Sequence, residues 1–504
     1  MNGKITPEQA GISSERVLRF LRNLDGYRMP LHSVIMSKGD EIYAEGYYAP
    51  FDEKFLHRMY SASKTFVAMA VGVAVTEGLL SLDDVIVDYL PEYKNPNVDE
   101  YYESCTVRDM LKMKSNVGTL VRWWGQFPDR VEAYYSMRTS KLPGTCFYYD
   151  SIGSFLLGCI IERLTGKTFL DYLKEKVLLE IGFSKESYTL REPGGFAVGD
   201  SGVMCTARDL WLLARFIMKK GAWGGKQYIN RAFMEEAVSS QSYNHFDSGL
   251  RSQSKSGYGY LIWKTHKDGF SLIGMGDQLA ICDEKRDLCL VLTADNQANT
   301  AAREVIYNEY YNHFLEKAED FPLPENEEAS AALAAYLASR TLVAQDGDTD
   351  SPLAERISGV PYIARENALG VKAFTLTLDK EEGRLSLVFA DKTVDFDFSI
   401  GKNKCTKFSY GTRARADMMG AYEEGAYDAA VSGAWVEKET FAVMAQVIDT
   451  YFGAACAYLS FKGEEATLSL TRSGQYVFED VEGFVIGKKI QIEKELLKWQ
   501  TEKK

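Results

Sequence analysis

A hydroxyl and an ammonium group stand together at the start of a strongly apolar segment. Ser61 and Lys64 are three positions apart and therefore share one face of a helix. The residues that follow, as far as Gly78, are almost all apolar or small on every face, which is typical of a buried helix. A helix start favours negative charge on the serine oxygen, and burial favours the neutral form of the lysine. The pair could therefore act as a nucleophile and its base.

The same two residues also have a purely structural interpretation, in which Ser61 caps the helix and the Lys64 side chain extends to solvent. A Ser-x-x-Lys pattern alone is weak, and the chain contains a second copy at Ser252–Lys255. That copy lies in a polar stretch with no apolar helix after it, so nothing there is expected to hold or desolvate its lysine. Only Ser61 and Lys64 therefore remain candidate catalytic residues.

Other hydrolytic chemistries find little support in the sequence. The segment Gly199–Gly202 lacks the final glycine of a Gly-x-Ser-x-Gly nucleophile turn. The five histidines show neither a His-Glu-x-x-His pattern nor any other metal-ligand spacing. No metal or organic cofactor is implied. The eight cysteines lack Cys-x-x-Cys spacing and are expected to be reduced, buried thiols.

The composition is that of a globular protein whose partner is a small molecule or a short peptide. The chain has 504 residues, 46% of them hydrophobic, which is enough for two domains. Its formal charge of -13 disfavours nucleic acid and anionic membranes as partners. The amino terminus lacks the pattern of a secretory signal, and the longest apolar run, Phe66–Val75, is too short to cross a bilayer. We therefore expect a cytoplasmic protein that does not bind membranes.

The elements that would position Ser61 are predicted from apolar periodicity and capping signals. Thr106 and Thr206 are each followed three positions later by an aspartate, which predicts two capped helices. The other predicted elements are a surface helix over residues 6–24, a hairpin over 33–48, strands over 258–263, 270–282 and 288–293, and a helix over 301–317. Together they indicate an α/β fold of the α+β type, with an antiparallel sheet flanked by helices.

A change of composition predicts a second domain. The acidic, proline-bearing stretch 319–326 is the best candidate linker, so we place the domains at residues 1–320 and 328–504. After a helix over about 327–342, segments such as Phe374–Leu378 and Ala466–Leu470 alternate apolar and polar residues strictly. This pattern predicts an antiparallel β domain that is barrel-like or sandwich-like. It contains no catalytic constellation, so we expect it to be structural or to gate the substrate.

Several motifs, taken in their order, resemble the serine β-lactamase and penicillin-binding-protein superfamily, most closely its class C-like branch of esterases and D-specific peptidases. The resemblance covers about residues 6–316. Residues 61–64 match the Ser-x-x-Lys motif, and residues 106–111 resemble the family's "TVRxLL" helix. Residues 143–151 look like "PGxxFxYSN", and residues 206–210 resemble "STARDL". The resemblance implies a β-lactamase or DD-peptidase-like fold for this domain.

The resemblance also implies a role for each matching residue. Ser61 would be the acylated nucleophile, Lys64 its base, and Tyr149 the tyrosine that passes the proton to the leaving group. The alternative for Tyr149 is ordinary packing. Ser151 stands where the family usually has asparagine, and it could hydrogen-bond Lys64 or the substrate. Asp150, between them, is expected to point to solvent.

The third motif of the family departs most from its usual form. The family has Lys-Thr-Gly or His-x-Gly on an inner strand, and Leu272–Gly274 aligns with it. Gly274 is retained, and the Met275 N–H could form an oxyanion hole with the Ser61 N–H. Leu272 replaces the group that binds a substrate carboxylate, which argues against β-lactams and peptides ending in D-alanine. Leu272→His would therefore be expected to improve binding of substrates that carry a carboxylate.

Other side chains could complete the substrate site. Lys264 or His266 could replace the missing cation, although a solvated turn is the more ordinary place for both. The aromatic residues near the motifs could line a pocket for an apolar group or belong to the core: Trp123, Trp124, Tyr148, Tyr260 and Trp263. The predicted function is that of a serine hydrolase acting on an ester or amide through an acyl-enzyme. The alternative is a non-catalytic, penicillin-binding-like module that only binds its ligand.

Overall fold

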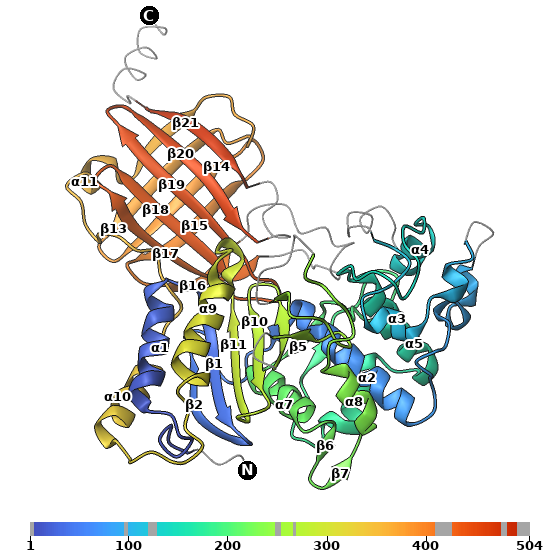
Figure 1. Cartoon of the computed structure of the whole chain (residues 1–504). Coiled ribbons are helices and arrows are strands. Elements are labelled where there is room, and N and C mark those ends of the chain that lie inside the picture. Colours follow the sequence, from blue (N-terminus) through green and yellow to red (C-terminus); the bar gives the residue numbers. More distant parts are fainter. Residues whose placement is uncertain are drawn as a thin grey trace, which may run out of the picture. The chain divides into compact units, whose positions relative to one another are not determined.

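The computed structural model (Figure 1) describes residues 5–94, 99–118, 129–246, 254–265, 269–408, 426–474 and 481–490. Within these ranges the chain forms two compact units, the first reaching Leu342 and the second starting at Val343. Helix α10 (Glu327–Ala338) belongs to the first unit, so the division lies later than the one predicted at residues 320–328. The reason is packing, because Leu333 is buried and a Cβ on Gly46 would lie 2.7 Å from Leu337.

The first unit is built on a six-stranded antiparallel sheet, as predicted, in the order β2-β1-β11-β10-β9-β8. The predicted hairpin over residues 33–48 is present as its first two strands. The strands are β1 (Leu31–Lys38), β2 (Glu41–Tyr47), β8 (Trp263–Lys264), β9 (Phe270–Gly274), β10 (Gln278–Asp283) and β11 (Leu288–Ala294). The central strands β9, β10 and β11 are buried along their whole length, because helices cover both faces of the sheet.

Two of the predicted strands have different bounds. The run 270–282 is not one strand but a hairpin, in which Gly274 pairs with Gln278 across the turn Met275–Asp277. Gly276 and Asp277 have φ values of +73° and +71°, and a glycine and an aspartate are among the residues that reach this region most easily. The run 258–263 is mostly irregular, and only its last residue belongs to β8. The hairpin places Gly274 and Met275 at the end of a strand.

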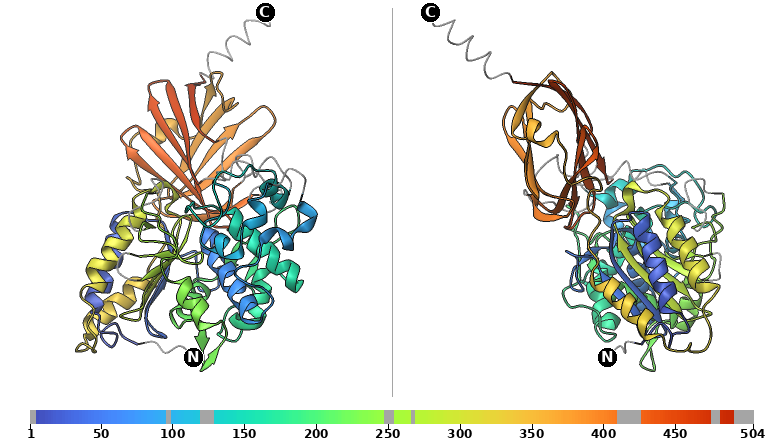
Figure 2. Two further views of the ribbon diagram at one scale, coloured as in Figure 1. Left: turned by 45° about the vertical axis from the view of Figure 1, so that its right-hand side comes forward. Right: turned by 90° about the vertical axis from the view of Figure 1, so that its left-hand side faces the viewer.

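Helices lie on both sides of this sheet. Figure 2 shows α1, α9 and α10 in front of it, and α7 packs on the other side against β1, β10 and β11. The predicted caps are confirmed, because Thr106 with Asp109 and Thr206 with Asp209 form capping boxes at α3 and α7. Besides α10, the described helices of this unit are α1 (Ser14–Gly26), α2 (Ser63–Thr76), α3 (Val107–Leu111), α4 (Arg130–Tyr135), α5 (Ile152–Thr165), α6 (Phe169–Leu173), α7 (Ala207–Met218), α8 (Arg231–Ala237) and α9 (Ala302–Tyr310).

Helix α2 is the most deeply buried of the longer helices of this unit. Every residue from Ser63 to Ala74 is buried, so the segment that sequence patterning placed inside the domain is confirmed there. Gly72 shows how close the packing is, because a Cβ on it would lie 2.7 Å from the Phe233 ring. Burying each large apolar side chain of such a helix contributes about 1.5–3 kcal/mol to stability. The start of α2 is therefore held rigidly.

The second unit is the predicted antiparallel β domain. Its sheet runs in the order β15-β14-β13-β12-β21-β20-β19-β18-β17-β16 and closes into a barrel-like form where β15 pairs with β17. Alternate side chains, among them Leu385, Phe396 and Leu468, are buried inside. The elements are α11 (Ala354–Ile357), β12 (Val360–Ala364), β13 (Ala373–Asp379), β14 (Glu382–Val388), β15 (Thr393–Ile400), β16 (Lys404–Phe408), β17 (Tyr427–Glu437), β18 (Thr440–Val447), β19 (Ala454–Lys462), β20 (Glu465–Ser473) and β21 (Gly483–Lys489).

Two further sequence predictions can be compared with the structure. All eight cysteines are unpaired, but Cys146 and Cys405 are exposed, so the expectation of burial is wrong for these two. Among the described helices, none combines the length and apolar character that crossing a membrane requires.

Candidate active site

The structure brings Ser61 and Lys64 into direct contact. Ser61 lies in a single 3₁₀ turn, Tyr60–Ala62 (η1), and Lys64 lies in the first turn of α2 that follows. The Lys64 side chain is buried, with the residue only 1% exposed, whereas Ser61 is partly exposed. The Lys64 Nζ donates hydrogen bonds to Ser61 Oγ at 3.1 Å and to the backbone oxygen of Asp200 at 2.9 Å. The Lys64 side chain therefore does not extend to solvent.

The backbone just before Ser61 adopts an unusual conformation. Tyr60 has a φ of +43°, a region that costs a residue with a side chain roughly 1–3 kcal/mol. The ring of Tyr60 is buried, and the Arg58 guanidinium lies 5.1 Å from its centroid. Such strain persists only where the surrounding packing fixes it. Tyr60 lies between β3 (His57–Arg58) and Ser61, so this fixed conformation directly precedes the partly exposed serine.

Residues 200–203 are joined to the segment around Ser61 by two further hydrogen bonds that involve side chains, and Asp200 has one more contact, with α4. Arg58 Nε donates to the Ser201 oxygen at 3.0 Å, and the Val203 N–H donates to Ser63 Oγ at 3.0 Å. The Asp200 carboxylate pairs with Arg130 Nη1 at 3.1 Å. Sequence reasoning used this stretch only to reject a nucleophile motif. The contact of Asp200 with Lys64 uses a backbone oxygen, which every residue type carries, so no sequence signal could have found it.

Tyr149 lies beside this pair, where the resemblance places it. The Lys64 Nζ is 5.3 Å from the centroid of the Tyr149 ring. The ring stacks on Trp263 at 5.1 Å between centroids with an interplanar angle of 27°, and Tyr258 meets it edge-on at 6.3 Å. Tyr149 itself remains partly exposed. The structure thus brings all three predicted catalytic residues together and gives the tyrosine an aromatic support.

Asp150 and Ser151 have different places from those expected. Asp150 is 4% exposed, so the expectation that it points to solvent is wrong. Its carboxylate accepts from the Gly153 N–H at 2.8 Å and from Ser115 Oγ at 3.0 Å, and burial raises the pKa of this carboxyl. Asp150 thereby caps the start of α5. Ser151 is partly exposed at the same helix start, and its hydroxyl is not among the hydrogen-bond partners of Lys64 in the described part of the chain.

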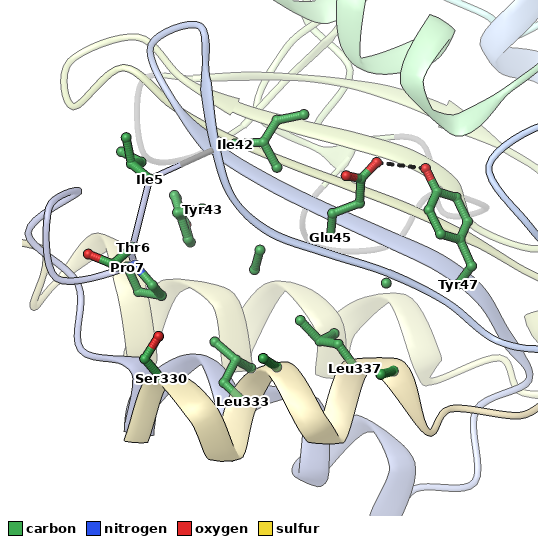
Figure 3. A pocket seen from close by; sticks show the side chains of 14 residues that line it. Ile5, Thr6, Pro7, Ile42, Tyr43, Glu45, Tyr47, Ser330, Leu333 and Leu337 are labelled. Atoms are coloured by element: carbon green, nitrogen blue, oxygen red, sulfur yellow. Dashed lines mark hydrogen bonds between the residues drawn. The ribbon is translucent and has the colours of Figure 1, made fainter. Parts of the chain in front are cut away.

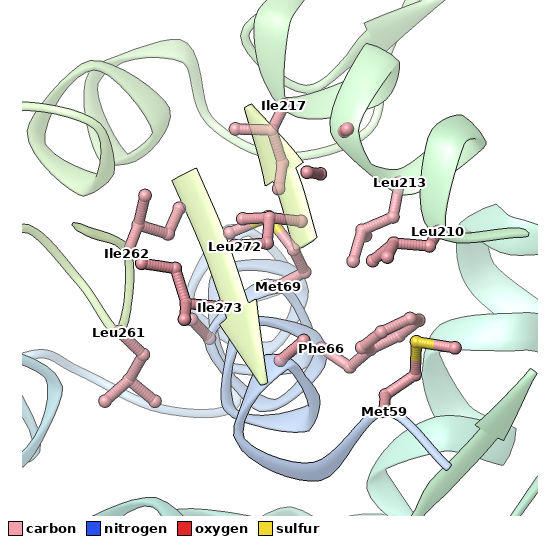
Figure 4. Close-up of a cluster of buried hydrophobic side chains, with 14 of the residues drawn as sticks. Met59, Phe66, Met69, Leu210, Leu213, Ile217, Leu261, Ile262, Leu272 and Ile273 are labelled. Carbon is pink, nitrogen blue, oxygen red and sulfur yellow. The ribbon is translucent and has the colours of Figure 1, made fainter. Parts of the chain in front are cut away.

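Strand β9 forms the other side of the site. A Cβ on Gly274 would lie 2.2 Å from the Met59 oxygen, so the strand touches the chain two residues before Ser61 and only glycine fits there. Met275 follows at the turn and is partly exposed. Leu272 is fully buried and lies in the apolar cluster that contains Phe66 and Met69 (Figure 4). A polar side chain at position 272 would therefore lie in the apolar core, which argues against the prediction that Leu272→His improves binding of a substrate carboxylate.

A hydrogen-bond network fixes the turn that carries Met275. The backbone oxygen of Gly274 accepts from the Asp277 N–H at 3.2 Å and from Arg303 Nη2 at 3.4 Å. The Asp277 carboxylate accepts from Arg303 Nε at 2.7 Å and from Asn296 Nδ2 at 3.0 Å. Because the oxygen of residue 274 and the N–H of Met275 belong to one peptide plane, these contacts also orient that N–H. Sequence reasoning missed all of these supporting residues.

The other predicted site residues divide into near, remote and undescribed ones. Trp263 lies at the site, as the stacking shows. Tyr260 does not, because it is buried and its hydroxyl accepts from Arg108 Nη1 at 2.9 Å. Lys264 lies on β8 and Tyr148 directly precedes Tyr149, and both are partly exposed. Trp123, Trp124, His266 and the serine of the Ser252–Lys255 copy lie outside the described residues.

A separate hollow of about 440 Å³ lies between β2 and α10 (Figure 3). It is lined mainly by apolar side chains such as Ile42, Leu333 and Leu337, with Glu45 accepting from the Tyr47 hydroxyl at 2.7 Å at one end. None of the predicted catalytic residues lines it.

Two hydrolases are among the relatives of this chain. A 6-aminohexanoate-dimer hydrolase of Paenarthrobacter ureafaciens is 26% identical over 259 residues, which are 48% of this chain and 66% of that protein. The esterase EstB of Burkholderia gladioli is 28% identical over 167 residues, 30% of this chain and 42% of that protein. The matches thus span less than two thirds of each relative's length.

Fold and family comparisons complete the assignment. A solved structure from Bacillus anthracis shares the fold with a TM-score of 0.53 at 18% identity, covering 64% of this chain and 89% of that one. The β-lactamase family profile matches residues 18–309, a range that contains Ser61, Lys64, Tyr149 and Gly274. The match covers more than half of the chain, and the chain therefore belongs to the β-lactamase family.

Proposed function

We propose that the chain is a serine hydrolase that cleaves an ester or an amide through an acyl-enzyme on Ser61. The observation that carries the proposal is the contact of 3.1 Å between Lys64 Nζ and Ser61 Oγ, made by a lysine that is only 1% exposed. The contact places the lysine nitrogen within hydrogen-bond reach of the serine hydroxyl, so the lysine can serve as a base for the serine proton. No metal or cofactor is needed for this chemistry.

The proposed reaction has two halves. Neutral Lys64 takes the proton of the Ser61 hydroxyl while Oγ attacks the carbonyl carbon of the substrate, which gives a tetrahedral intermediate. Tyr149, beside the Lys64 ammonium, relays that proton to the leaving alcohol or amine as its bond to carbon breaks. Water then attacks the acyl-enzyme, loses a proton to the same groups, and releases the acid together with free Ser61.

The developing oxyanion would be held by two backbone N–H groups. The Ser61 N–H lies at the start of a buried helix, where the helix dipole favours negative charge. The Met275 N–H lies at the end of β9, and the peptide that contains it is oriented through the Gly274 oxygen. Donors of this kind contribute most when they are fixed before the reaction begins.

The substrate is proposed to be a small molecule or short peptide without an essential carboxylate next to the scissile bond. Leu272 is buried in the core where the family motif has a cation or a polar residue, which disfavours β-lactams as substrates. The relatives are named as a 6-aminohexanoate-dimer hydrolase and an esterase, which supports amide or ester cleavage here. Ser151 and Trp263 are the proposed contacts for the substrate itself.

Labelling with a fluorophosphonate probe, together with turnover of short p-nitrophenyl esters, tests the proposal. The wild-type protein should be labelled and should turn over, whereas Ser61→Ala should do neither. Ser252→Ala, which alters the second Ser-x-x-Lys copy, is the matched control and should behave like the wild type. A wild-type protein that is neither labelled nor active would refute the hydrolase proposal.

The same experiment addresses the second candidate, a module that binds its ligand without turnover. The apolar position 272 favours this candidate, because a family site with part of its substrate-binding group removed could keep binding and lose catalysis. Such a module would be acylated by the probe at Ser61 at most once and would release no p-nitrophenol beyond that stoichiometric amount.

A further inference from the structure

The immediate surroundings of Lys64 contain an unusual arrangement of charge. Its two hydrogen-bond acceptors in the described residues are the hydroxyl of Ser61 and the backbone oxygen of Asp200, neither of which is charged. The carboxylate of the same Asp200 is instead paired with Arg130, with both side chains almost fully buried at 1% and 3% exposure. One residue therefore offers its backbone to the lysine and its charge to an arginine.

We propose that Arg130 and Asp200 are positioning residues that hold the Lys64 amine against Ser61 and keep the Asp200 carboxylate away from it. This inference rests on the proposed hydrolase function and extends it to residues that do not touch the substrate. The Asp200 oxygen fixes one hydrogen bond of the amine, and the position of that oxygen follows from the carboxylate that Arg130 holds. The pair also balances its own charge.

The burial of Arg130 supports a specific role. Burial lowers the pKa of this guanidinium, and its cation lies 5.2 Å from the Phe155 ring of α5. Replacing a buried ion pair by apolar residues is often neutral or stabilising, so the pair is not needed for stability alone. The pair involves the side chain of the same residue whose backbone oxygen accepts from Lys64, and this placement is consistent with a role in positioning the lysine.

Several other ionisable groups lie around Lys64 and Arg130. Tyr149 faces Lys64 with its ring, and the buried Asp150 carboxyl lies close enough to interact electrostatically with the lysine. Arg58 lies near Arg130 and donates to the Ser201 oxygen. Glu192, 3% exposed, is a second buried carboxyl that attracts Arg130. Within the described ranges, Asp200 makes a hydrogen bond to the lysine through its backbone and another to the arginine through its side chain.

Loss of the positive charge and loss of the negative charge should therefore shift the pH profile of kcat/KM in opposite directions. Arg130→Met leaves the Asp200 carboxylate unpaired near Lys64, and a nearby negative charge favours the protonated amine. The acidic limb of the pH profile of kcat/KM should move to higher pH by about one unit, with about tenfold lower activity below the limb. Asp200→Asn removes the negative charge and leaves the Arg130 cation in place, so the limb should move to lower pH.

The test is the pH profile of kcat/KM with a p-nitrophenyl ester for the full-length wild type, Arg130→Met, Asp200→Asn and the double variant. The double variant keeps the backbone oxygen of residue 200 and removes both charges, so its limb should return to within a few tenths of a unit of the wild type. Arg130→Lys, which keeps the charge, should shift the limb less than Arg130→Met. Opposite shifts in the single variants with recovery in the double variant support the proposal.

Two outcomes overturn it. If both single variants lower activity without moving the limb, the pair is merely structural. If both move it in the same direction, the charge argument is wrong. Should Arg130→Met fail to fold, as judged by circular dichroism, Asp200→Asn and the double variant still decide. Failure of the proposed function is distinguishable, because the wild type itself would then show no turnover and no labelling at Ser61.

Discussion

The two sides of the site are held by different kinds of contact. On the polar wall, formed by Ser61, Lys64 and residues 200–203, hydrogen bonds of about 3 Å connect side chains to backbone oxygens and N–H groups. On the apolar wall, formed by β9, Leu272 packs into the core and Gly274 touches the backbone at Met59. Directed contacts fix individual atoms, whereas apolar packing fixes a strand without offering a polar group to a ligand.

The difference separates two tasks within one site. The polar wall carries the proposed catalytic residues, while the apolar wall carries Leu272 at the position where the family resemblance implies a cation or a polar residue. Substitutions in the two walls should therefore fail in different ways. Those in the polar wall should lower the rate with little loss of stability, and those in the apolar wall should lower stability first.

Lys64→Met gives the largest expected effect. The variant removes the proposed base, so kcat/KM for an ester should fall roughly 10²- to 10⁴-fold. The fold should not be weakened, because exchanging a buried charge for an apolar chain of similar length is often neutral or stabilising. Ester hydrolysis and thermal unfolding measure the two effects. Lys167→Met, which alters a half-exposed lysine just after α5, is the control and should keep nearly full activity; a similar loss there would remove the distinction between the walls.

Leu272→Ala should act mainly on stability. Removing a fully buried leucine side chain costs about 2–5 kcal/mol of unfolding free energy, measured by urea denaturation. Leu272→His should cost at least as much and should not improve the KM of carboxylate-bearing esters, since the ring would start in an apolar cluster. Leu272→Met should cost less than about 1.5 kcal/mol. A stable Leu272→His variant with improved carboxylate binding would contradict the packing of the apolar wall.

Gly274→Ala joins the two walls and should affect both properties moderately. A Cβ there would lie 2.2 Å from the Met59 oxygen, so either β9 or the turn that carries Ser61 must move. We expect a loss of about 1–3 kcal/mol in stability and a roughly 10- to 100-fold loss of kcat/KM. Gly26→Ala is the matched control, because nothing lies within 4 Å of its Cβ. Equal stability and equal kcat/KM of the two variants would mean that β9 does not touch the turn that carries Ser61.

Acid should lower the stability of the fold by a smaller amount. Burial lowers the pKa of His57, in the strand before Ser61, to about 3, while an unfolded histidine has a pKa near 6.5. Between these values the unfolded chain binds a proton that the folded chain does not, so stability falls as the pH falls through this window. At pH 5.5 His57 alone should cost about 1.4 kcal/mol relative to pH 8.

Urea unfolding at the two pH values measures this loss. His57→Phe should reduce the acid sensitivity, and His313→Gln, which alters a partly exposed histidine, should leave it unchanged. If His57→Phe and the wild type lose the same stability on acidification, the buried histidine is not the group responsible.

Much of the framework was predictable from the sequence because it depends on local patterns. The hairpin at 31–47, the capping boxes at Thr106 and Thr206, the buried helix α2 and the alternating strands of the second unit all follow from residue type and spacing. The three proposed catalytic residues were found because their side chains form ordered motifs. The family resemblance implied that these three residues lie close together, and periodicity alone did not.

The rest depends on contacts between distant parts of the chain. The apolar run 270–282 gave no sign of the turn at Met275–Asp277, because the residues on both sides have the same character. The boundary at Leu342 depends on Leu333 and Leu337 packing against β2. The sequence suggests a solvent-facing Asp150, yet its carboxylate is buried and accepts hydrogen bonds from Ser115 and from the Gly153 N–H.

The buried pair of Arg130 and Asp200 has a consequence for how sequences of this kind can diverge. An isolated change at either position leaves one charge without its partner inside the fold, whereas a simultaneous change of both to uncharged residues keeps the backbone oxygen that Lys64 uses. Positions 130 and 200 should therefore be inherited as a unit. Related chains should carry opposite charges at both or charges at neither, even though 70 residues separate them in the sequence.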